Sequence, residues 1–317
     1  MSKEDSRRKA LKGSAAQTVA DTLPTVAPAA SQKKAQVFFT RDLSAAGLRK
    51  IYAKISRNLT GRIAVKVHTG EPHGPNLIPR DMVMGLMEDI PGGVIVECNV
   101  AYPGPRYTTE GHRQLLVTNG WDFCPVDILD ADGDASLPIP NGRWLKEVAV
   151  GRHLLDYDSM LVLTHFKGHP MGGFGGSLKN VAIGCASGRT GKRQLHQEGN
   201  DPWAPGPRFM ERMVEGGSAV THRFGARIAC INVLRNLSID CDCVGINAAA
   251  PTAPDIGILA STDILAVDKA SVDIIYALPE AQRRDLQERI ESRGGLRQIE
   301  YMKILGMGND EYELITL

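Results

Sequence analysis

The chain has 317 residues, enough for one large domain or for a domain with a second lobe. Its 37 Lys and Arg residues nearly balance its 36 Asp and Glu residues, so no strong overall field attracts the protein to nucleic acid or to an acidic membrane. Its six cysteines are too sparse for a disulfide framework, and no run approaches the roughly 18 apolar residues of a membrane helix. We therefore expect no nucleic-acid partner and no transmembrane segment.

The first 34 residues differ from the rest of the chain. Residues 6–12, SRRKALK, resemble the twin-arginine export signal at every position but Ala10, where that signal has Phe. An alanine-rich stretch follows, and residues 27–29, APA, form a small-residue cleavage site. We expect residues 1–34 to be a signal or disordered segment outside the fold, and the protein to be exported to the periplasm. The alternative is a flexible basic arm on a cytoplasmic protein.

From residue 35 onward, strand patterns alternate with helix patterns along the chain. The pattern predicts strands at 37–40, 62–68, 93–98, 125–129, 146–150, 160–164, 227–234, 255–260 and 312–316. It predicts helices at 44–58, 79–90, 108–119, 207–224, 262–276, 280–293 and 296–305. Such alternation is typical of an α/β fold with a mainly parallel sheet and helices on both faces. We expect residues 35–317 to form one large domain of this class.

Glycines and basic residues are concentrated between residues 161 and 196, LVLTHFKGHPMGGFGGSLKNVAIGCASGRTGKRQLH. Glycine lets a backbone approach a ligand closely, and consecutive bare N–H groups form an anion-binding concavity. The predicted anion-binding residues are Gly172, Gly173, Gly175, Gly176, Lys179 and Arg189. No complete phosphate-loop or dinucleotide fingerprint is present, so nothing selects a nucleotide over a carboxylate or sulfonate. The alternative is a set of tight turns with solvated basic residues.

Titratable side chains follow several predicted strands at the point where each strand ends. His68 and Cys98 end two of these strands, His165 and Lys167 end a third, and residues 240–243, DCDC, follow a fourth. Ligands of open α/β sheets bind beyond the carboxyl ends of strands. We therefore expect these side chains to lie around one cleft.

Cysteines supply the predicted metal ligands. Cys241 and Cys243 are one residue apart, so that two thiolates can reach the same soft metal or cluster iron. The other candidate ligands are Cys98, Cys185 and His165. The alternatives for the Cys241–Cys243 pair are a strained redox disulfide in an exported protein, or two thiols buried as small apolar groups.

Seven short motifs carry a resemblance to a known family. They are KVHTGE at 66–71, VECN at 96–99, THFKGH at 164–169, GGFGGSLKN at 172–180, GCA at 184–186, DCDC at 240–243 and DIGILAS at 255–261. Together they resemble the domain of unknown function 362 family from about residue 35 to the carboxyl end. Many relatives are described as iron–sulfur proteins because of an added ferredoxin segment with four closely spaced cysteines. That segment is absent here, so a cluster would have to use the dispersed Cys98, Cys185, Cys241 and Cys243.

Two functions of different class remain open. The first is an exported metal- or iron–sulfur-binding protein with a redox or lyase-type role and a redox partner or a small anionic ligand. The second is a metal-free enzyme or binding protein for a small anion, held by the glycine segment with Lys167, Lys179 and Arg189. In the second function His68 or His169 acts as the general base. The predicted catalytic residues are His68, Lys167 and His169.

Overall fold

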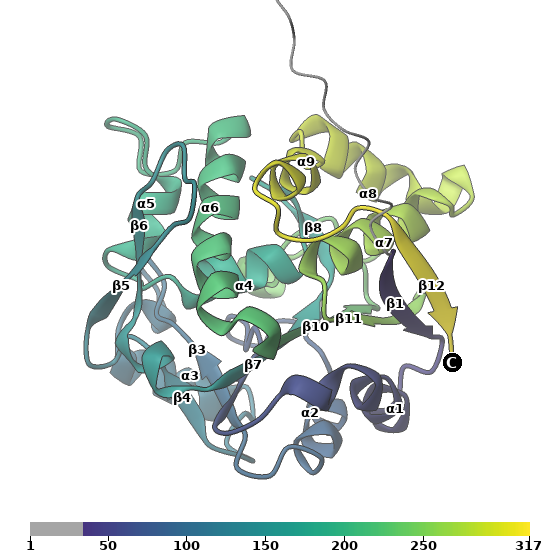
Figure 1. The fold of residues 1–317 in the computed structure, drawn as a ribbon, viewed down its shortest axis with the longest axis horizontal. Helices are drawn as coiled ribbons and strands as arrows, with labels where there is room; N and C mark the ends of the chain where they lie inside the picture. The colour runs from purple at the N-terminus through teal and green to yellow at the C-terminus, as the bar shows by residue number, and fades with distance from the viewer. Residues whose placement is uncertain (1–33) are drawn as a thin grey trace, which may run out of the picture. The chain divides into compact units, whose positions relative to one another are not determined.

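Eight strands form one sheet at the centre of the molecule, in the order β12-β1-β11-β10-β7-β2-β3-β4 (Figure 1). The structure is a computed structural model and describes residues 34–317. The strands of this sheet are β1 (Ala35–Thr40), β2 (Ile63–Lys66), β3 (Val94–Glu97), β4 (Val126–Ile128), β7 (Ser159–His165), β10 (Ile228–Leu234), β11 (Gly257–Ser261) and β12 (Tyr312–Thr316). Strands β2, β3, β4, β7 and β10 are parallel to their neighbours in this set, and β1 is parallel to β12. Only β11 runs antiparallel, pairing with β1 and β10.

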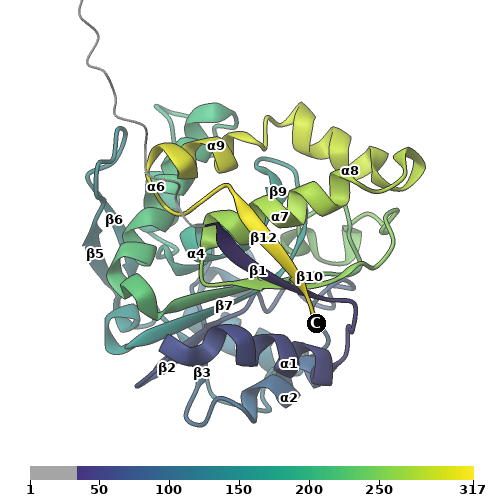
Figure 2. The same ribbon diagram turned by 45° about the vertical axis from the view of Figure 1, so that its right-hand side comes forward.

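Helices cover both faces of the sheet (Figures 1 and 2). Helices α1 (Ala45–Ile55) and α2 (Arg80–Met87) lie on one face, and α3 (Thr109–Thr118) contributes Leu116 to the same apolar cluster. The other face carries α4 (Ser177–Cys185), α5 (Gly191–His196), α6 (Pro207–Phe224), α7 (Ile264–Tyr276), α8 (Glu280–Ser292) and α9 (Arg297–Ile304). Short 3-10 turns are η1 (Ser56–Asn58), η2 (Pro105–Tyr107), η3 (Arg152–Asp156), η4 (Gly225–Arg227) and η5 (Asp242–Asn247).

Alternation along the buried strands divides the core into two layers. Every residue of β7 is buried; Leu161 and Leu163 pack toward α1 and α2, whereas Met160 and Val162 pack on the opposite face. Successive side chains of a strand point to opposite faces, so a strand covered on both sides is apolar throughout. This explains why β7 reads as a continuous apolar run in the sequence.

Local sequence signals mark several helix ends. Ser44 accepts the N–H of Gly47 at 3.2 Å and caps α1, and Asp263 accepts that of Ala266 at 2.9 Å and caps α7. Pro207 opens α6, where a missing N–H costs nothing. These caps explain why the predicted helix starts lie within a few residues of the observed ones.

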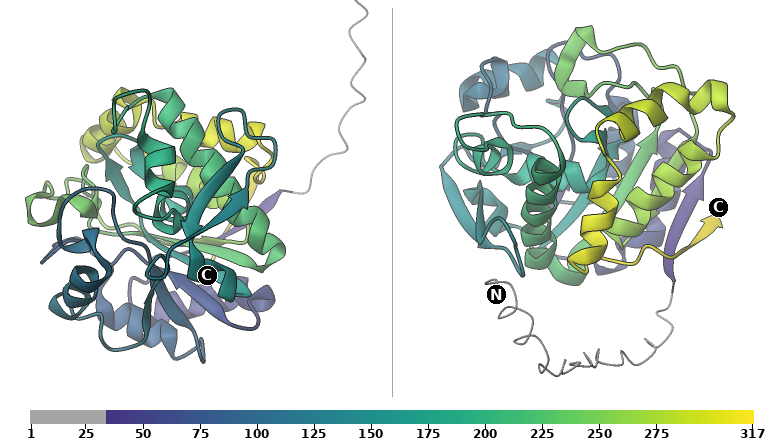
Figure 3. Two further views of the ribbon diagram at one scale, coloured as in Figure 1. Left: turned by 90° about the vertical axis from the view of Figure 1, so that its left-hand side faces the viewer. Right: turned by 90° about the horizontal axis from the view of Figure 1, so that it is seen from above.

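The expected α/β class is confirmed, with differences in detail. β6 (Glu147–Gly151), expected in the main sheet, pairs with β5 (Asp134–Pro138) in a separate ribbon, on the side of the molecule that faces the viewer in the left view of Figure 3. The glycine-rich stretch forms the hairpin β8 (Lys167–His169) and β9 (Gly173–Gly175), followed by α4 and α5. The predicted export segment lies outside the described residues, apart from Lys34. Among residues 34–317 no helix has the length and apolar character needed to cross a membrane.

Candidate functional site

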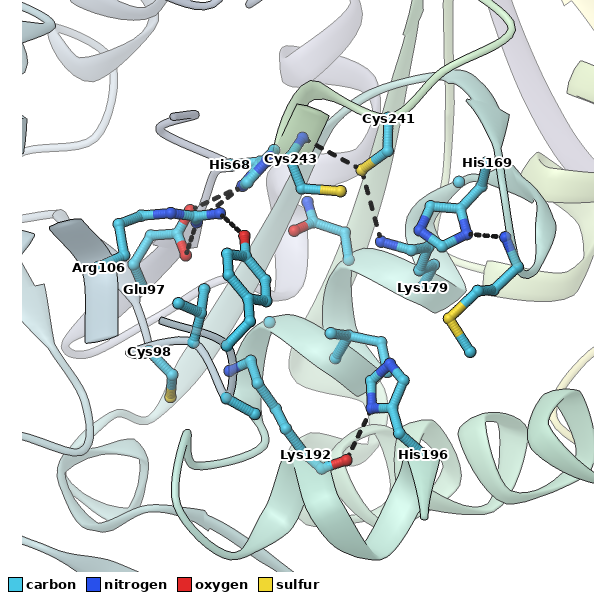
Figure 4. A pocket seen from close by; sticks show the side chains of 18 of the residues that line it. His68, Glu97, Cys98, Arg106, His169, Lys179, Lys192, His196, Cys241 and Cys243 are labelled. Carbon is cyan, nitrogen blue, oxygen red and sulfur yellow. Dashed lines mark hydrogen bonds and ion pairs between the residues drawn. The ribbon is translucent and has the colours of Figure 1, made fainter. Parts of the chain in front are cut away.

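A cavity of about 260 Å³ lies beyond the carboxyl ends of β2, β3 and β7 (Figure 4). These strands are mutually parallel, so their ends meet at one edge of the sheet, where α/β folds bind ligands. Nine of the residues predicted from the sequence line it, namely His68, Cys98, Lys167, His169, Gly175, Gly176, Lys179, Cys241 and Cys243. The structure thus brings most of the expected rim together at one cavity.

Five cationic side chains line this cavity: Lys66, Arg106, Lys167, Lys179 and Lys192. Three of them have a carboxylate partner: Lys66 Nζ lies 3.7 Å from Glu97, Arg106 Nη2 2.6 Å from Glu71, and Lys167 Nζ 2.9 Å from Asp242. Buried charges of this kind persist because they are paired and hydrogen-bonded. The lining nevertheless carries more positive than negative side chains, which favours an anionic ligand.

Two cysteines and a histidine form a compact group in the cavity wall. Candidate ligand atoms of His169, Cys241 and Cys243 all lie within 4.8 Å of one another. His169 comes from β8, and the cysteines come from the loop that leads into η5 and from η5 itself. Among residues 34–317 this is the one group of three His, Cys, Asp or Glu side chains close enough to hold a metal ion.

The two cysteines of this group differ in their ionisation. Cys241 Sγ accepts the backbone N–H of Cys243 at 3.4 Å and lies 3.9 Å from Lys179 Nζ. Hydrogen bonding from Cys243 and the charge of Lys179 lower the pKa of Cys241 well below its ordinary value, against the effect of burial. Hydrogen bonding of the Cys243 thiol to Cys241, together with burial, raises the pKa of Cys243 well above its ordinary value. The pair therefore holds one thiolate and one thiol.

Backbone hydrogen bonds fix the tautomer of His169. Its Nδ1 accepts N–H groups from Gly172 at 2.9 Å and Met171 at 3.2 Å. Nδ1 therefore carries a lone pair, and the neutral ring holds its proton on Nε2. Burial lowers the pKa of His169 to about 4, so the ring is neutral at pH 7.

His68 and Glu97 form a second pair in the cavity wall. His68 Nδ1 lies 3.2 Å from Glu97 Oε1, which also accepts the N–H of Thr69 at 2.8 Å. Although burial opposes it, Lys66 and His68 hold the pKa of Glu97 well below its ordinary value. We assign the Nδ1 proton to the shorter contact, with Glu97 as acceptor, although Arg106 Nη1, also a donor, lies 3.4 Å from the same nitrogen. The lone pair then falls on Nε2 of His68, which is buried and has no hydrogen-bond partner within residues 34–317. Because burial also lowers the pKa of His68, the ring is a neutral base.

His165, predicted as a metal ligand, lies behind the cavity wall. Its Nδ1 is 2.9 Å from Asp242 Oδ2, and its Nε2 is 2.8 Å from the carbonyl of Arg235. Both ring nitrogens are engaged, so no lone pair is available for a metal. His165 instead positions Asp242, which in turn holds Lys167.

Two backbone N–H groups at the end of the glycine-rich segment bind an aspartate of the protein itself. Asp268 accepts the N–H groups of Ser177 at 2.7 Å and Leu178 at 2.9 Å, at the start of α4. A Cβ on Gly176 would overlap this carboxylate, and a Cβ on Gly173, at φ +78°, would lie 2.8 Å from Gly295. These glycines serve close packing, and Gly172 and Gly173 do not line the cavity. The N–H groups just after the glycines therefore bind an internal carboxylate, whereas Gly175, Gly176 and Lys179 line the cavity, where an external anion remains a prediction.

Two further predicted residues lie away from the cavity. Arg189 is exposed and borders a separate surface depression beside Arg193. Cys185 is fully buried and does not line the cavity, although its carbonyl accepts the thiol of Cys98 at 3.3 Å. The four dispersed cysteines thus do not surround one point, because the ligand group described above holds neither Cys98 nor Cys185.

Other cavity residues were not predicted, namely Lys66, Glu97, Arg106, Lys192 and His196. Lys66 and Glu97 had a sequence signal, since each is a lone charge in an apolar strand that ends at this edge. Arg106, Lys192 and His196 come from η2 and α5, which only the tertiary structure brings to the cavity.

Comparisons with known proteins identify a family and two distant folds. The profile of the domain of unknown function (DUF362) family matches residues 63–273. The lactate racemase apoprotein from Thermoanaerobacterium thermosaccharolyticum is 10% identical, with a TM-score of 0.40 over 76% of this chain and 57% of the racemase. A protein from Thermotoga maritima is 13% identical, with a TM-score of 0.36 over 79% of this chain and 58% of that one. This chain therefore spans less than two thirds of either structure, and no curated protein matches its sequence.

Proposed function

We propose that this chain, which belongs to the domain of unknown function (DUF362) family, is an enzyme that holds a soft metal ion beside a basic cavity and acts there on a small anion. The observation that carries the proposal is the group of His169, Cys241 and Cys243 in the wall of that cavity. Two sulfur ligands and one imidazole with an open position are typical of a catalytic site for zinc or a similar metal.

The protonation of the group supports metal binding at the cysteines. Cys241 is already favoured as a thiolate, and a cation would also favour ionisation of Cys243. An iron–sulfur cluster is less well supported, because no third cysteine joins this group. We therefore propose a single ion with Cys241 and Cys243 as its main ligands.

The residues across the cavity support a lyase-type role more than a redox role. His68, held by Glu97, lines the cavity and is a neutral base; because protein atoms cover its Nε2, a small rotation of the ring would let that nitrogen remove a proton from a bound substrate. A bound metal would act as a Lewis acid on a substrate oxygen. Lys167, fixed by Asp242, would supply positive charge where negative charge develops on the substrate.

Metal analysis after anaerobic purification tests the proposal. We expect about one equivalent of a soft metal in the wild type, and a loss of at least tenfold in a variant with Cys241→Ser and Cys243→Ser. The matched control replaces Cys98 and Cys185 by Ser, which removes the same number of thiols from outside the group and should leave the metal content unchanged. A wild type free of metal, or equal loss in both variants, contradicts the proposal.

A second candidate is a metal-free enzyme that uses the Cys241 thiolate, and the tautomer of His169 favours it. Because Nδ1 of His169 accepts two backbone N–H groups, a metal would have to displace the Nε2 proton. As a donor, that N–H instead helps to lower the pKa of Cys241. Under this candidate the anaerobically purified wild type contains no metal, and Cys241→Ser alone abolishes activity.

We also propose that the protein is exported, on the basis of the signal-like sequence at residues 6–12. Replacement of Arg7 and Arg8 by Lys should keep the protein out of the periplasm without changing its stability. A periplasmic fraction that is the same with and without the replacements would contradict this. Cytoplasmic location of the wild type would favour the basic-arm alternative.

A further inference from the structure

Lys192 differs from the other cations of the cavity in the partners that it has. Lys66, Arg106 and Lys167 each have a carboxylate partner, and Lys179 lies against the Cys241 thiolate. Lys192 has no acidic partner within hydrogen-bonding distance among the described residues. Its Nζ donates one hydrogen bond, of 2.6 Å, to the carbonyl of Ala186.

No carboxylate forms an ion pair with Lys192 within residues 34–317, although Asp130 and Glu97 act on it from beyond hydrogen-bonding distance. Lys192 is 6% exposed and lines the cavity. Burial lowers the pKa of Lys192, against the opposing charge effects of Cys98 and Asp130. Cys98 remains a thiol, because burial raises its pKa well above its ordinary value. Asp130 uses its oxygens to accept the N–H groups of Asn99 and Gly188. An ammonium group with two unused N–H donors is costly to bury unless an anion joins it.

We propose that Lys192 anchors a carboxylate of a small substrate at the end of the cavity remote from the Cys241 group. This inference deepens the proposed function by naming the class of its anion. Figure 4 shows Lys192 and His196 on one side of the cavity, and His169, Lys179 and the two cysteines on the other. A carboxylate held by Lys192 would direct the rest of the substrate toward the proposed metal site.

The available donors fit a carboxylate better than a phosphate. A phosphate usually binds several N–H groups, often at the start of a helix. At the start of α4 the N–H groups of Ser177 and Leu178 already bind Asp268. Lys192 offers two free donors, which match the two oxygens of one carboxylate.

His196 and Trp203 give this subsite an apolar wall. His196 Nδ1 lies 2.7 Å from the backbone carbonyl of Lys192, so that this nitrogen carries the proton. Burial lowers the pKa of His196 to about 3, so the ring is neutral and does not compete with Lys192 for the anion. The ring of Trp203 lies 4.9 Å from that of His196 and also lines the cavity. Such walls weaken water as a competitor and strengthen the ion pair.

Calorimetric titration of the chelator-treated full-length chain tests the anchor. The probes are acetate and propionate, with acetamide and inorganic phosphate for comparison, at low ionic strength to limit screening. We expect Lys192→Met to weaken acetate binding at least tenfold. The matched control is Arg193→Met, which removes an exposed cation from the same helix outside the cavity and should change the affinity less than twofold.

Three results would overturn the inference: equal acetate affinity in wild type and Lys192→Met, acetamide binding as tight as acetate, or phosphate binding tighter than acetate. If Lys192→Met does not fold, lysine methylation of the wild type with mass-spectrometric readout replaces it. Propionate should then protect Lys192 but not the exposed Lys303, and equal protection of both would also overturn the anchor.

Metal analysis of the same preparations separates this inference from the proposed function. A wild type without metal that still binds acetate through Lys192 sustains the anchor while the metal proposal fails. A metal-containing wild type that binds no carboxylate after chelation gives the opposite result and overturns the anchor alone.

Discussion

Two pairs of cysteines in this protein contribute to the same edge of the sheet but differ in chemistry. Cys241 and Cys243 lie beside Lys179 and His169, and the pKa of Cys241 is lowered well below its ordinary value. Cys98 donates its thiol to the carbonyl of Cys185, and burial raises the pKa of both residues, that of Cys185 to about 11.

The difference between the pairs comes from their neighbours and not from exposure. Cys98, Cys185 and Cys241 are all at most 1% exposed. A positive charge and hydrogen-bond donors stabilise a thiolate at Cys241, whereas burial, the charge of Asp130 and a carbonyl acceptor stabilise a thiol at Cys98. The presence of cysteine at a sheet edge therefore does not by itself make a metal or catalytic site.

Thiol reactivity gives the largest expected contrast between the pairs. In chelator-treated protein at pH 7, we expect Cys241 to react with iodoacetamide on the order of 100-fold faster than Cys98 or Cys185, because only thiolates react. Cys124 is an internal control, since it is more exposed than Cys241 but burial raises its pKa to about 11. Peptide mass spectrometry over time measures the rates. If Cys124 reacts first, exposure rather than ionisation controls reactivity, which contradicts the expected thiolate at Cys241.

The pH dependence of stability tests whether the surroundings of Cys98 disfavour a charged side chain. His112, whose Nδ1 is 3.2 Å from Asn99, is fully buried, and burial lowers its pKa to about 3. Between pH 7 and 5 the unfolded chain, with an ordinary histidine pKa near 6.5, takes up a proton that the folded chain does not. Stability should therefore fall as the pH falls, and His112 should contribute about 2 kcal/mol of that loss.

Urea unfolding at pH 7 and pH 5 measures the contribution of His112 to this loss of stability. His112→Gln should remove the contribution of about 2 kcal/mol from the difference between pH 7 and pH 5. The exposed His222 provides a matched control as His222→Gln, which should keep the dependence of the wild type. If the unfolding free energy of the His112 variant differs between pH 7 and pH 5 as much as that of the wild type, His112 is protonated in the folded protein and this region accepts a charge.

The smallest expected effect concerns stability at Cys98 itself. Cys98→Ala removes a buried sulfur and its hydrogen bond to Cys185, and should lower the free energy of unfolding by about 1–2 kcal/mol. Metal content should not change, because Cys98 does not belong to the group around Cys241. A large loss of metal in this variant would indicate that both pairs of cysteines hold the metal, as the four-cysteine hypothesis expects.

Much of the fold could be predicted from local patterns. Strand and helix periodicity placed α6 at its observed bounds, Pro207–Phe224, and β12 at Tyr312–Thr316. Periodicity could not assign β6 to its partner, because pairing depends on a non-local neighbour, β5. Nor did it reveal α4, since glycine and serine at its start are weak helix signals without the Asp268 carboxylate.

The sequence by itself determined which strand ends carry titratable groups, and hence that His68, Lys167 and Cys241 would meet at one edge of a parallel sheet. It did not determine which of them would be ionised or available. Only the tertiary structure decided that His165 is engaged by Asp242, that Asp268 binds the N–H groups of Ser177 and Leu178, and that α5 brings Lys192 to the cavity. The physical reason is that hydrogen bonding, desolvation and charge act over a few ångströms in space, between residues that are far apart along the chain.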